Sequence, residues 1–160
     1  MEIYEFAMQM EKEGEDYYRG LASKTDHQGL KSILGMLADA KAQHRRLFTC
    51  LEKREHAQMA DTELLTEVKK IFGEMKKEKK TGWNHPDIEL YRKALDRERK
   101  TADLYRSHAG QMTDRAQKEA FLKIAREGEK HFAILEEIVE FMTRPDTWLE
   151  NPEWYHLEEY

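Results

Sequence analysis

The chain has 160 residues, enough for one domain that buries roughly two thirds of its unfolded surface. Charged residues make up 37% and hydrophobic residues 39%, and a net charge of −5 with both signs interspersed argues against nucleic-acid binding by bulk electrostatics. No apolar run approaches the ~20 residues that span a bilayer, so we expect no membrane partner.

The N-terminus, MEIYEFAMQMEKEGE, is acidic and lacks the charged-then-apolar pattern of a secretion signal. The one cysteine, Cys50, excludes an internal disulfide and fits a reducing compartment. It also excludes a Cys-x-x-Cys iron or zinc module within this chain. These features predict a cytoplasmic protein.

Apolar residues recur at helical spacing in four long segments, which predict helices over about 3–22, 26–54, 86–111 and 114–143. The second follows Thr25-Asp26, the third begins around Pro86, and the fourth follows Thr113-Asp114. The connection 55–85 contains a short amphipathic stretch, TELLTEVKKIFGEMKKEKK, that we expect to be helical for part of its length.

Two short-looped helical hairpins joined by a long crossover are typical of the ferritin-like four-helix bundle. We therefore predict an all-α bundle over residues 1–143. The tail, 144–160, contains two Trp and two Tyr, and we expect it to pack on the bundle or on a partner subunit.

The two hairpins are related by an ungapped internal repeat. Glu11 and Glu98 are separated by 98 − 11 = 87 positions, and the same offset relates further identical pairs: Tyr18/Tyr105, His44/His131, Asp16/Asp103, Arg19/Arg106, Ala22/Ala109 and Ala38/Ala125. A repeat that preserved only a core would keep Leu and Ala. This one also keeps Glu and His within apolar stripes.

Four of these polar residues, one on each predicted helix, form a candidate metal-binding set: Glu11, His44, Glu98 and His131. Alone, each is better explained as a surface carboxylate or a hydrogen-bonded core histidine. Together they place two carboxylates in a core, where a nearby cation lowers the cost of burial, and neutral His adds nitrogen ligands. Tyr18 and Tyr105 lie two turns beyond their Glu and could donate hydrogen bonds to a carboxylate.

A family resemblance rests on these same segments. The stretches MEKEGEDYYRGLA and LDRERKTADLYRSHA resemble the Glu-x6-Tyr helices of rubrerythrin-like members of the ferritin-like superfamily. The stretches LADAKAQHRRLFTCLE and IAREGEKHFAILEEI resemble their Glu-x-x-His helices, and WLENPEWYHLEEY resembles the tail of short members. The resemblance implies a di-iron protein of peroxide, oxygen or iron handling, a homodimer, and a separate electron donor.

The resemblance also shows where this chain departs from the family. Glu11, His44, Glu98 and His131 match the terminal iron ligands, but Lys41 and Gly128 occupy the positions of the two bridging carboxylates. Neither residue can bridge two cations, and a protonated Lys41 would repel a metal by roughly 4 kcal/mol per unit charge at ~4 Å and an effective dielectric of 20.

Two outcomes remain open at this stage. In the first, the two Glu and two His hold a single divalent ion such as Fe, Zn or Mn, and the protein is a metal-binding, peroxidase-like oxidoreductase. In the second, the bundle is metal-free, Lys41 pairs with Glu11 or Glu98, and the protein acts through structure, interaction or a small ligand. An apolar cavity lined by Gly128, Tyr18 and Tyr105 would favour the small ligand.

Overall fold

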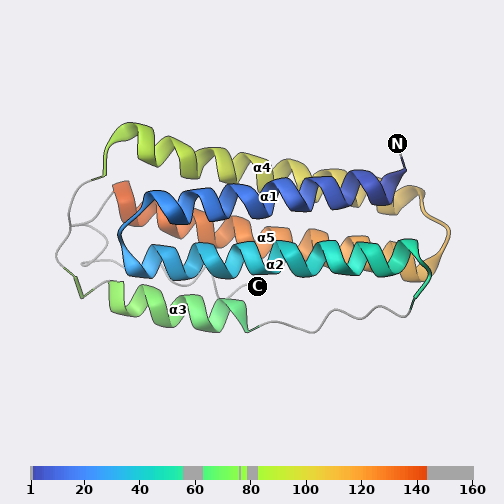
Figure 1. The fold of residues 1–160 in the computed structure, drawn as a ribbon, viewed down its shortest axis with the longest axis horizontal. Coiled ribbons are helices and arrows are strands. Elements are labelled where there is room, and N and C mark those ends of the chain that lie inside the picture. The colour runs from blue at the N-terminus through green and yellow to red at the C-terminus, as the bar shows by residue number, and fades with distance from the viewer. Residues whose placement is uncertain (1, 56–62, 76, 79–82, 144–160) are drawn as a thin grey trace. The chain divides into compact units, whose positions relative to one another are not determined.

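The computed structural model describes residues 2–55, 63–75, 77–78 and 83–143. Within these ranges the chain forms five α-helices and no strand (Figure 1): α1 (Ile3–Lys24), α2 (Gln28–Glu52), α3 (Leu64–Met75), α4 (His85–Gln111) and α5 (Arg115–Thr143). The all-α class expected from the sequence is confirmed. The tail 144–160 lies outside the described residues, so its packing stays a prediction.

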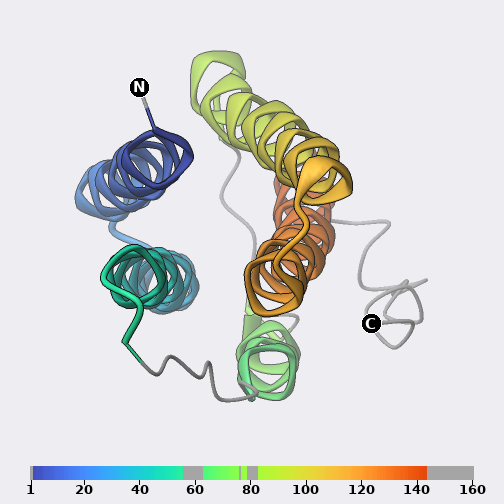
Figure 2. The same ribbon diagram turned by 90° about the vertical axis from the view of Figure 1, so that its right-hand side faces the viewer.

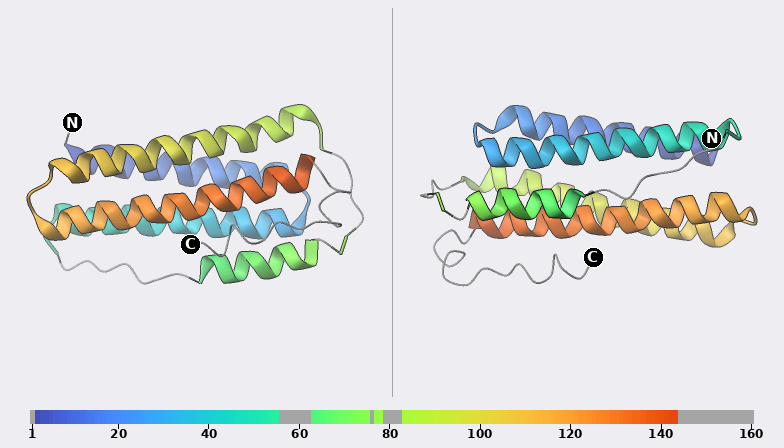
Figure 3. Two further views of the ribbon diagram at one scale, coloured as in Figure 1. Left: turned by 180° about the vertical axis from the view of Figure 1, so that it is seen from behind. Right: turned by 90° about the horizontal axis from the view of Figure 1, so that it is seen from below.

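The chain divides into two compact units, Met1–Leu64 and Leu65–Tyr160. Each contains one pair of long helices packed as an antiparallel hairpin, α1 on α2 and α4 on α5. The two helices of each pair lie side by side in the end view of Figure 2 and in the views from behind and from below of Figure 3. The boundary separates the two halves of the internal repeat, so each unit holds one Glu-bearing and one His-bearing helix.

Local hydrogen bonds explain where the helices begin. The Asn84 side chain accepts a bond from the Asp87 amide, and the Asp114 side chain accepts one from the Gln117 amide. Helix α2 begins at Gln28 rather than at 26, because the ring Nδ1 of His27 accepts the amide of Leu30 at 3.2 Å. The first helix continues to Lys24, two residues beyond the expected end.

Helix α2 ends at Glu52, two residues before the expected position. Arg54 adopts a left-handed backbone with φ of 57°. The amide of Glu55 then bonds the carbonyl of Cys50 at 2.9 Å, and the amide of Arg54 bonds that of Leu51 at 3.1 Å. This is a Schellman termination with arginine at the position that usually holds glycine.

The connection between the hairpins is helical over α3, as the amphipathic pattern predicts. Its apolar side chains at helical spacing are buried: Leu64, Val68, Phe72 and Met75. None of the helices that the structure describes has both the length and the apolar character needed to span a bilayer.

The polar residues of the predicted inner stripes are almost completely buried. Exposed fractions are between 0% and 5% for the five that carry the chemical argument: Glu11, Lys41, His44, Glu98 and His131. They lie among apolar side chains of the same stripes, including Ala7, Leu37, Ile124 and Leu135. A polar group in such surroundings needs hydrogen bonds or opposite charge close by, and these contacts define the candidate site.

Candidate metal centre

In the α1–α2 hairpin, Glu11 and His44 are in direct contact. The ring Nδ1 of His44 lies 2.7 Å from Oε1 of Glu11, at hydrogen-bond distance. The Glu comes from the middle of α1 and the His from the second half of α2, where the antiparallel packing brings the two helices side by side. The structure thus brings together the two ligands that the sequence assigned to the first hairpin.

Lys41 completes this cluster. It lies one turn before His44 on α2, and its Nζ is 3.8 Å from Oε2 of Glu11, so each carboxylate oxygen contacts a different nitrogen group. The stem of Lys41 runs against α1 at Gly14, where an added Cβ would meet Lys41 Cε at 3.2 Å and Cδ at 3.3 Å. The missing side chain of Gly14 therefore makes room for the lysine stem.

The α4–α5 hairpin holds the second predicted ligand pair in a looser contact. The ring Nδ1 of His131 lies 3.4 Å from Oε1 of Glu98. An added Cβ at Gly128 would lie 3.5 Å from Oε2 of Glu98 and 3.5 Å from Cβ of Ala102, an ordinary contact distance. The second carboxylate oxygen of Glu98 thus faces the place where a side chain at position 128 would begin.

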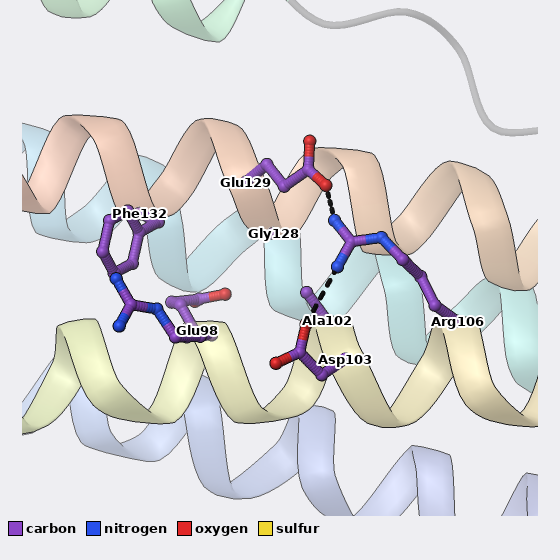
Figure 4. A pocket seen from close by; sticks show the side chains of 8 residues that line it. Glu98, Ala102, Asp103, Arg106, Gly128, Glu129 and Phe132 are labelled. Carbon is purple, nitrogen blue, oxygen red and sulfur yellow. Dashed lines mark hydrogen bonds and ion pairs between the residues drawn. The ribbon is translucent and has the colours of Figure 1, made fainter.

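A pocket of about 250 Å³ opens at Gly128 between α4 and α5. Figure 4 shows the Glu98 carboxylate directed toward α5 near Gly128. At the rim, Arg106 contacts Asp103 and Glu129, and the Arg99 guanidinium lies 4.7 Å from the centre of the Phe132 ring. Five of the eight residues that line the pocket have charged side chains, and neither Tyr18 nor Tyr105 belongs to it. The lining residues thus differ from the set of Gly128, Tyr18 and Tyr105 that the sequence suggested for a cavity.

Tyr18 and Tyr105 are both buried in their hairpins, with 2% and 1% exposure. The Tyr105 ring packs edge-on against Phe121 at 5.6 Å between ring centres. This contact shows the tyrosine as part of the apolar core. A hydrogen bond from either phenol to a carboxylate stays a prediction.

Sequence reasoning missed a second charged cluster beside the first site. Glu15 is 7% exposed and accepts hydrogen bonds from Arg45 at 2.6 Å and Arg19 at 2.9 Å, while Arg19 also contacts Asp39 at 3.1 Å. Burial raises the pKa of the Glu15 carboxyl, but the bonds and charges of Arg45 and Arg19 outweigh it and hold that pKa below the ordinary value. The sequence does contain one signal for this cluster: Glu15 and Arg19 are four residues apart on one helix, a spacing at which opposite charges can pair.

Comparison with known proteins places the chain in a family. The family model described as Rubrerythrin matches residues 2–139. The chain belongs to the rubrerythrin family. Membership supports the ferritin-like bundle predicted from the sequence and makes a metal cofactor, typically iron in this family, the natural expectation for the site. Neither a curated protein nor a solved structure matches the chain.

The residues present do not fit the di-iron centre of rubrerythrins. At the two positions that the resemblance assigns to bridging carboxylates, this chain has Lys41, whose ammonium is directed at Glu11, and Gly128, which has no side chain. Among the residues that the structure describes, no group of three or more His, Cys, Asp or Glu side chains could hold a metal ion. Convergence of Glu11, His44, Glu98 and His131 on one ion stays a prediction.

Proposed function

We propose that in this rubrerythrin-family chain the Lys41 ammonium takes the place of the di-iron centre, and that the protein binds a small ligand instead of two irons. One observation carries the proposal: the Nζ of Lys41 lies 3.8 Å from a carboxylate oxygen of Glu11, and the two residues are 5% and 0% exposed. Lysine is rarely buried unless an anion compensates its charge, and here the anion is the expected iron ligand.

Electrostatics favours the lysine over a metal at Glu11. A metal ion held by that carboxylate would lie close to the ammonium and be repelled by roughly 4 kcal/mol per unit charge at ~4 Å and an effective dielectric of 20. The Lys41 ammonium supplies one positive charge and needs no fixed coordination geometry. The His44 ring contacts the other carboxylate oxygen of Glu11. Redox cycling between two irons is therefore not part of the proposed activity, and the bundle needs no electron donor.

A second candidate function keeps one divalent ion, Fe, Zn or Mn, at Glu98 and His131. The observation in its favour is the looser 3.4 Å contact of this pair, beside a pocket of about 250 Å³ with room for water. Against it, catalytic metal sites commonly have three protein ligands, and this hairpin supplies two. In both candidates the homodimer expected from the family resemblance stays a proposal.

Elemental analysis of the purified protein separates these functions. After growth with iron, zinc and manganese, the main proposal expects less than ~0.1 metal ion per chain, because the metal-binding free energy has been lost. About one ion per chain would favour the Glu98–His131 site. About two irons per chain would overturn the exchange of metal for lysine.

Restoring both carboxylates gives a sharper test. Lys41→Glu with Gly128→Glu recreates a Glu-x-x-His motif in each hairpin, and we expect iron occupancy to rise to about one or more per chain. The matched control, Lys12→Glu with Gly35→Glu, introduces the same charges where Lys12 is exposed and a Cβ at Gly35 meets no neighbouring atom. Equal iron contents in the two double variants would show that the inner faces are not arranged as proposed.

A further inference from the structure

The pocket at Gly128 extends from the surface of the α4–α5 hairpin to its buried Glu98–His131 pair. Its lining comes from both helices and includes exposed, half-buried and buried residues (Figure 4): Arg99, Asp103, Arg106, Glu129, Phe132, Glu98, Ala102 and Gly128. At the buried end, Oε2 of Glu98 lies 3.5 Å from the place where a Cβ at Gly128 would begin. The other oxygen, Oε1, is the one that lies 3.4 Å from the ring of His131.

The internal repeat shows what occupies the same position in the first hairpin. Three lining residues have charged counterparts 87 positions earlier (128 − 41, 102 − 15 and 132 − 45): Gly128 corresponds to Lys41, Ala102 to Glu15 and Phe132 to Arg45. The stem of Lys41 runs from α2 against Gly14 on α1. The Arg45 guanidinium on α2 meets the Glu15 carboxylate on α1 at 2.6 Å. Side chains of this chain therefore cross between α1 and α2 at the position that corresponds to the pocket.

The second hairpin has neither of these crossings. Gly128 has no side chain, and the single methyl group of Ala102 cannot reach across to α5. The Phe132 ring instead contacts the Arg99 guanidinium, 4.7 Å from the ring centre. The resulting space is about 250 Å³. Since a cavity of about 150 Å³ accommodates benzene, the pocket has room for a small organic molecule.

The charged residues at the rim of the pocket cancel one another. The rim has two carboxylates, Asp103 and Glu129, and two guanidinium groups, Arg99 and Arg106, so its net charge is 2 − 2 = 0. Arg106 contacts both carboxylates, one on its own helix and one on α5. Such a rim attracts neither cations nor anions, and a charged molecule would have to give up water on entering. An uncharged molecule enters without that cost.

We propose that the pocket at Gly128 is a binding site for a small uncharged molecule, which reaches the buried Glu98 from the surface between α4 and α5. The Glu15–Arg45 pair and the Lys41 stem close the equivalent route to Glu11 in the first hairpin. Such a site deepens the proposed function, because it names the hairpin that admits the small ligand. It rests on that function in one respect, that no metal is bound at Glu98.

Thiol labelling of the full chain, treated with chelator and carrying Cys50→Ser, tests access to the pocket. The probes are hydroxyethyl, aminoethyl and sulfonatoethyl methanethiosulfonate, which differ in charge but share the ethyl linker. Ala102→Cys places the thiol in the pocket. Ala94→Cys places it at a 0% exposed position of the same helix outside the lining, and Lys100→Cys at an exposed one.

We expect the hydroxyethyl reagent to modify Ala102→Cys at least about tenfold faster than Ala94→Cys, whose thiol becomes accessible only through local opening. With each rate constant divided by that of Lys100→Cys, the two charged reagents should react at Ala102→Cys at least about tenfold more slowly than the hydroxyethyl reagent. Equal rates at positions 102 and 94 would overturn the proposed access. A normalised rate for either charged reagent that equals the uncharged one would overturn the preference for uncharged molecules.

Transfer of the closing pair from the first hairpin to the second gives an independent test. With the reporter thiol at Gly128→Cys, the double change Ala102→Glu with Phe132→Arg should slow the hydroxyethyl reagent at least about tenfold, because a charged pair then crosses between α4 and α5. The matched control, Ala116→Glu with Ala120→Arg, adds the same charges near the start of α5 outside the pocket and should leave the rate unchanged. Equal rates in the two folded variants would contradict the closing role. If the transferred pair prevents folding, the comparison of positions 102 and 94 still decides.

The labelling experiment and the metal experiment fail separately. Stoichiometric iron in the protein as purified would overturn the proposed function, whatever the metal-free protein admits. Slow labelling of Ala102→Cys in protein shown to be metal-free would overturn only the site at Gly128, and would leave the exchange of metal for Lys41 intact.

Discussion

The Nζ of Lys41 and Oε2 of Glu11 lie 3.8 Å apart between α1 and α2, with 6% and 0% of the two side chains exposed. The other oxygen of Glu11 contacts His44 at 2.7 Å. The carboxylate is thus held by nitrogen groups on both sides, one of them the Lys41 ammonium, and it belongs to the residue that the family resemblance assigns as an iron ligand. A buried ion pair of this kind is costly to break from one side, because the remaining charge loses its compensation without regaining water.

Replacing the lysine by a neutral chain of similar length should therefore destabilise the protein strongly. We expect Lys41→Met, in chelator-treated protein, to lower the free energy of unfolding by about 3–5 kcal/mol. Urea denaturation measures the change. The exposed pair of Lys12 with Asp16 provides the control, since Lys12→Met should cost no more than about 1 kcal/mol.

A compensating change shows whether the loss comes from the uncompensated carboxylate. Adding Glu11→Gln to Lys41→Met removes both charges, and the double variant should recover most of the lost stability, because neutral replacements of buried ion pairs are often tolerated. A Lys41→Met variant no less stable than Lys12→Met would contradict the buried pair. A double variant less stable than Lys41→Met would show that the two residues act independently.

Two glycines on the inner faces should respond differently to the same substitution. Alanine stabilises a helix interior by about 1 kcal/mol relative to glycine, provided that its Cβ has space. Gly128→Ala meets its nearest atoms at 3.5 Å and should gain most of this amount. Gly14→Ala would press on Cε of Lys41 at 3.2 Å, and the held ammonium limits how far that stem can move.

We therefore expect Gly14→Ala to be no more stable than the parent protein in urea denaturation, and Gly128→Ala to be more stable. Gly20→Ala serves as the reference for the helix effect alone, because a Cβ there meets no neighbouring atom within 4 Å. Equal gains at Gly14 and Gly20 would show that the Lys41 stem is not confined against α1.

The helical spacing of apolar residues predicted most of the fold, because the residues of the inner stripes of the four long helices are the ones that are buried. Helix ends were missed where one side chain or one backbone angle decides them, as at His27, whose ring caps α2, and at Arg54, whose left-handed backbone ends it. The hydrophobic pattern contains no information on the side-chain cap or on the backbone angle.

The candidate site was predictable in its residues but not in its contacts. The repeat makes Glu11 and Glu98 equivalent in register, so the sequence left open which carboxylate Lys41 would meet. Its contact with Glu11 depends on the room at Gly14, whose counterpart in the repeat is Thr101. The pocket at Gly128 depends likewise on pairwise packing across two helices, which single-helix patterns do not contain.

An arginine-to-glycine substitution should have opposite effects on stability at the end of α2 and inside that helix. A left-handed backbone costs a non-glycine residue about 1–2 kcal/mol, so Arg54→Gly should raise the free energy of unfolding by about 1 kcal/mol. Arg46→Gly, an exposed position inside the same helix, should lower it by about 1 kcal/mol. Thermal unfolding of both variants measures the contrast. Destabilisation by Arg54→Gly would show that this arginine makes a contact worth more than its backbone cost.

The Glu15 cluster links stability to acid. Because Arg45 and Arg19 hold the Glu15 pKa below the ordinary value of 4.5, the unfolded chain takes up this proton at a higher pH than the folded protein does. Above that unfolded value the stabilisation by ionised Glu15 is fully present, and it is lost as the pH falls through the lowered folded pKa. Glu15→Gln removes the charge at every pH, so it should destabilise the protein at pH 7 and much less in acid.

Urea midpoints of the parent and Glu15→Gln proteins, compared from neutral pH down to below the folded pKa, give this difference directly. We expect the two midpoints to converge as the carboxyl of Glu15 protonates. The control is Glu13→Gln, an exposed position on the same helix that contacts Gln9, and it should change stability by no more than about 0.5 kcal/mol at pH 7. A constant difference between parent and Glu15→Gln across the whole range would mean that Glu15 contributes through packing and not through its charge.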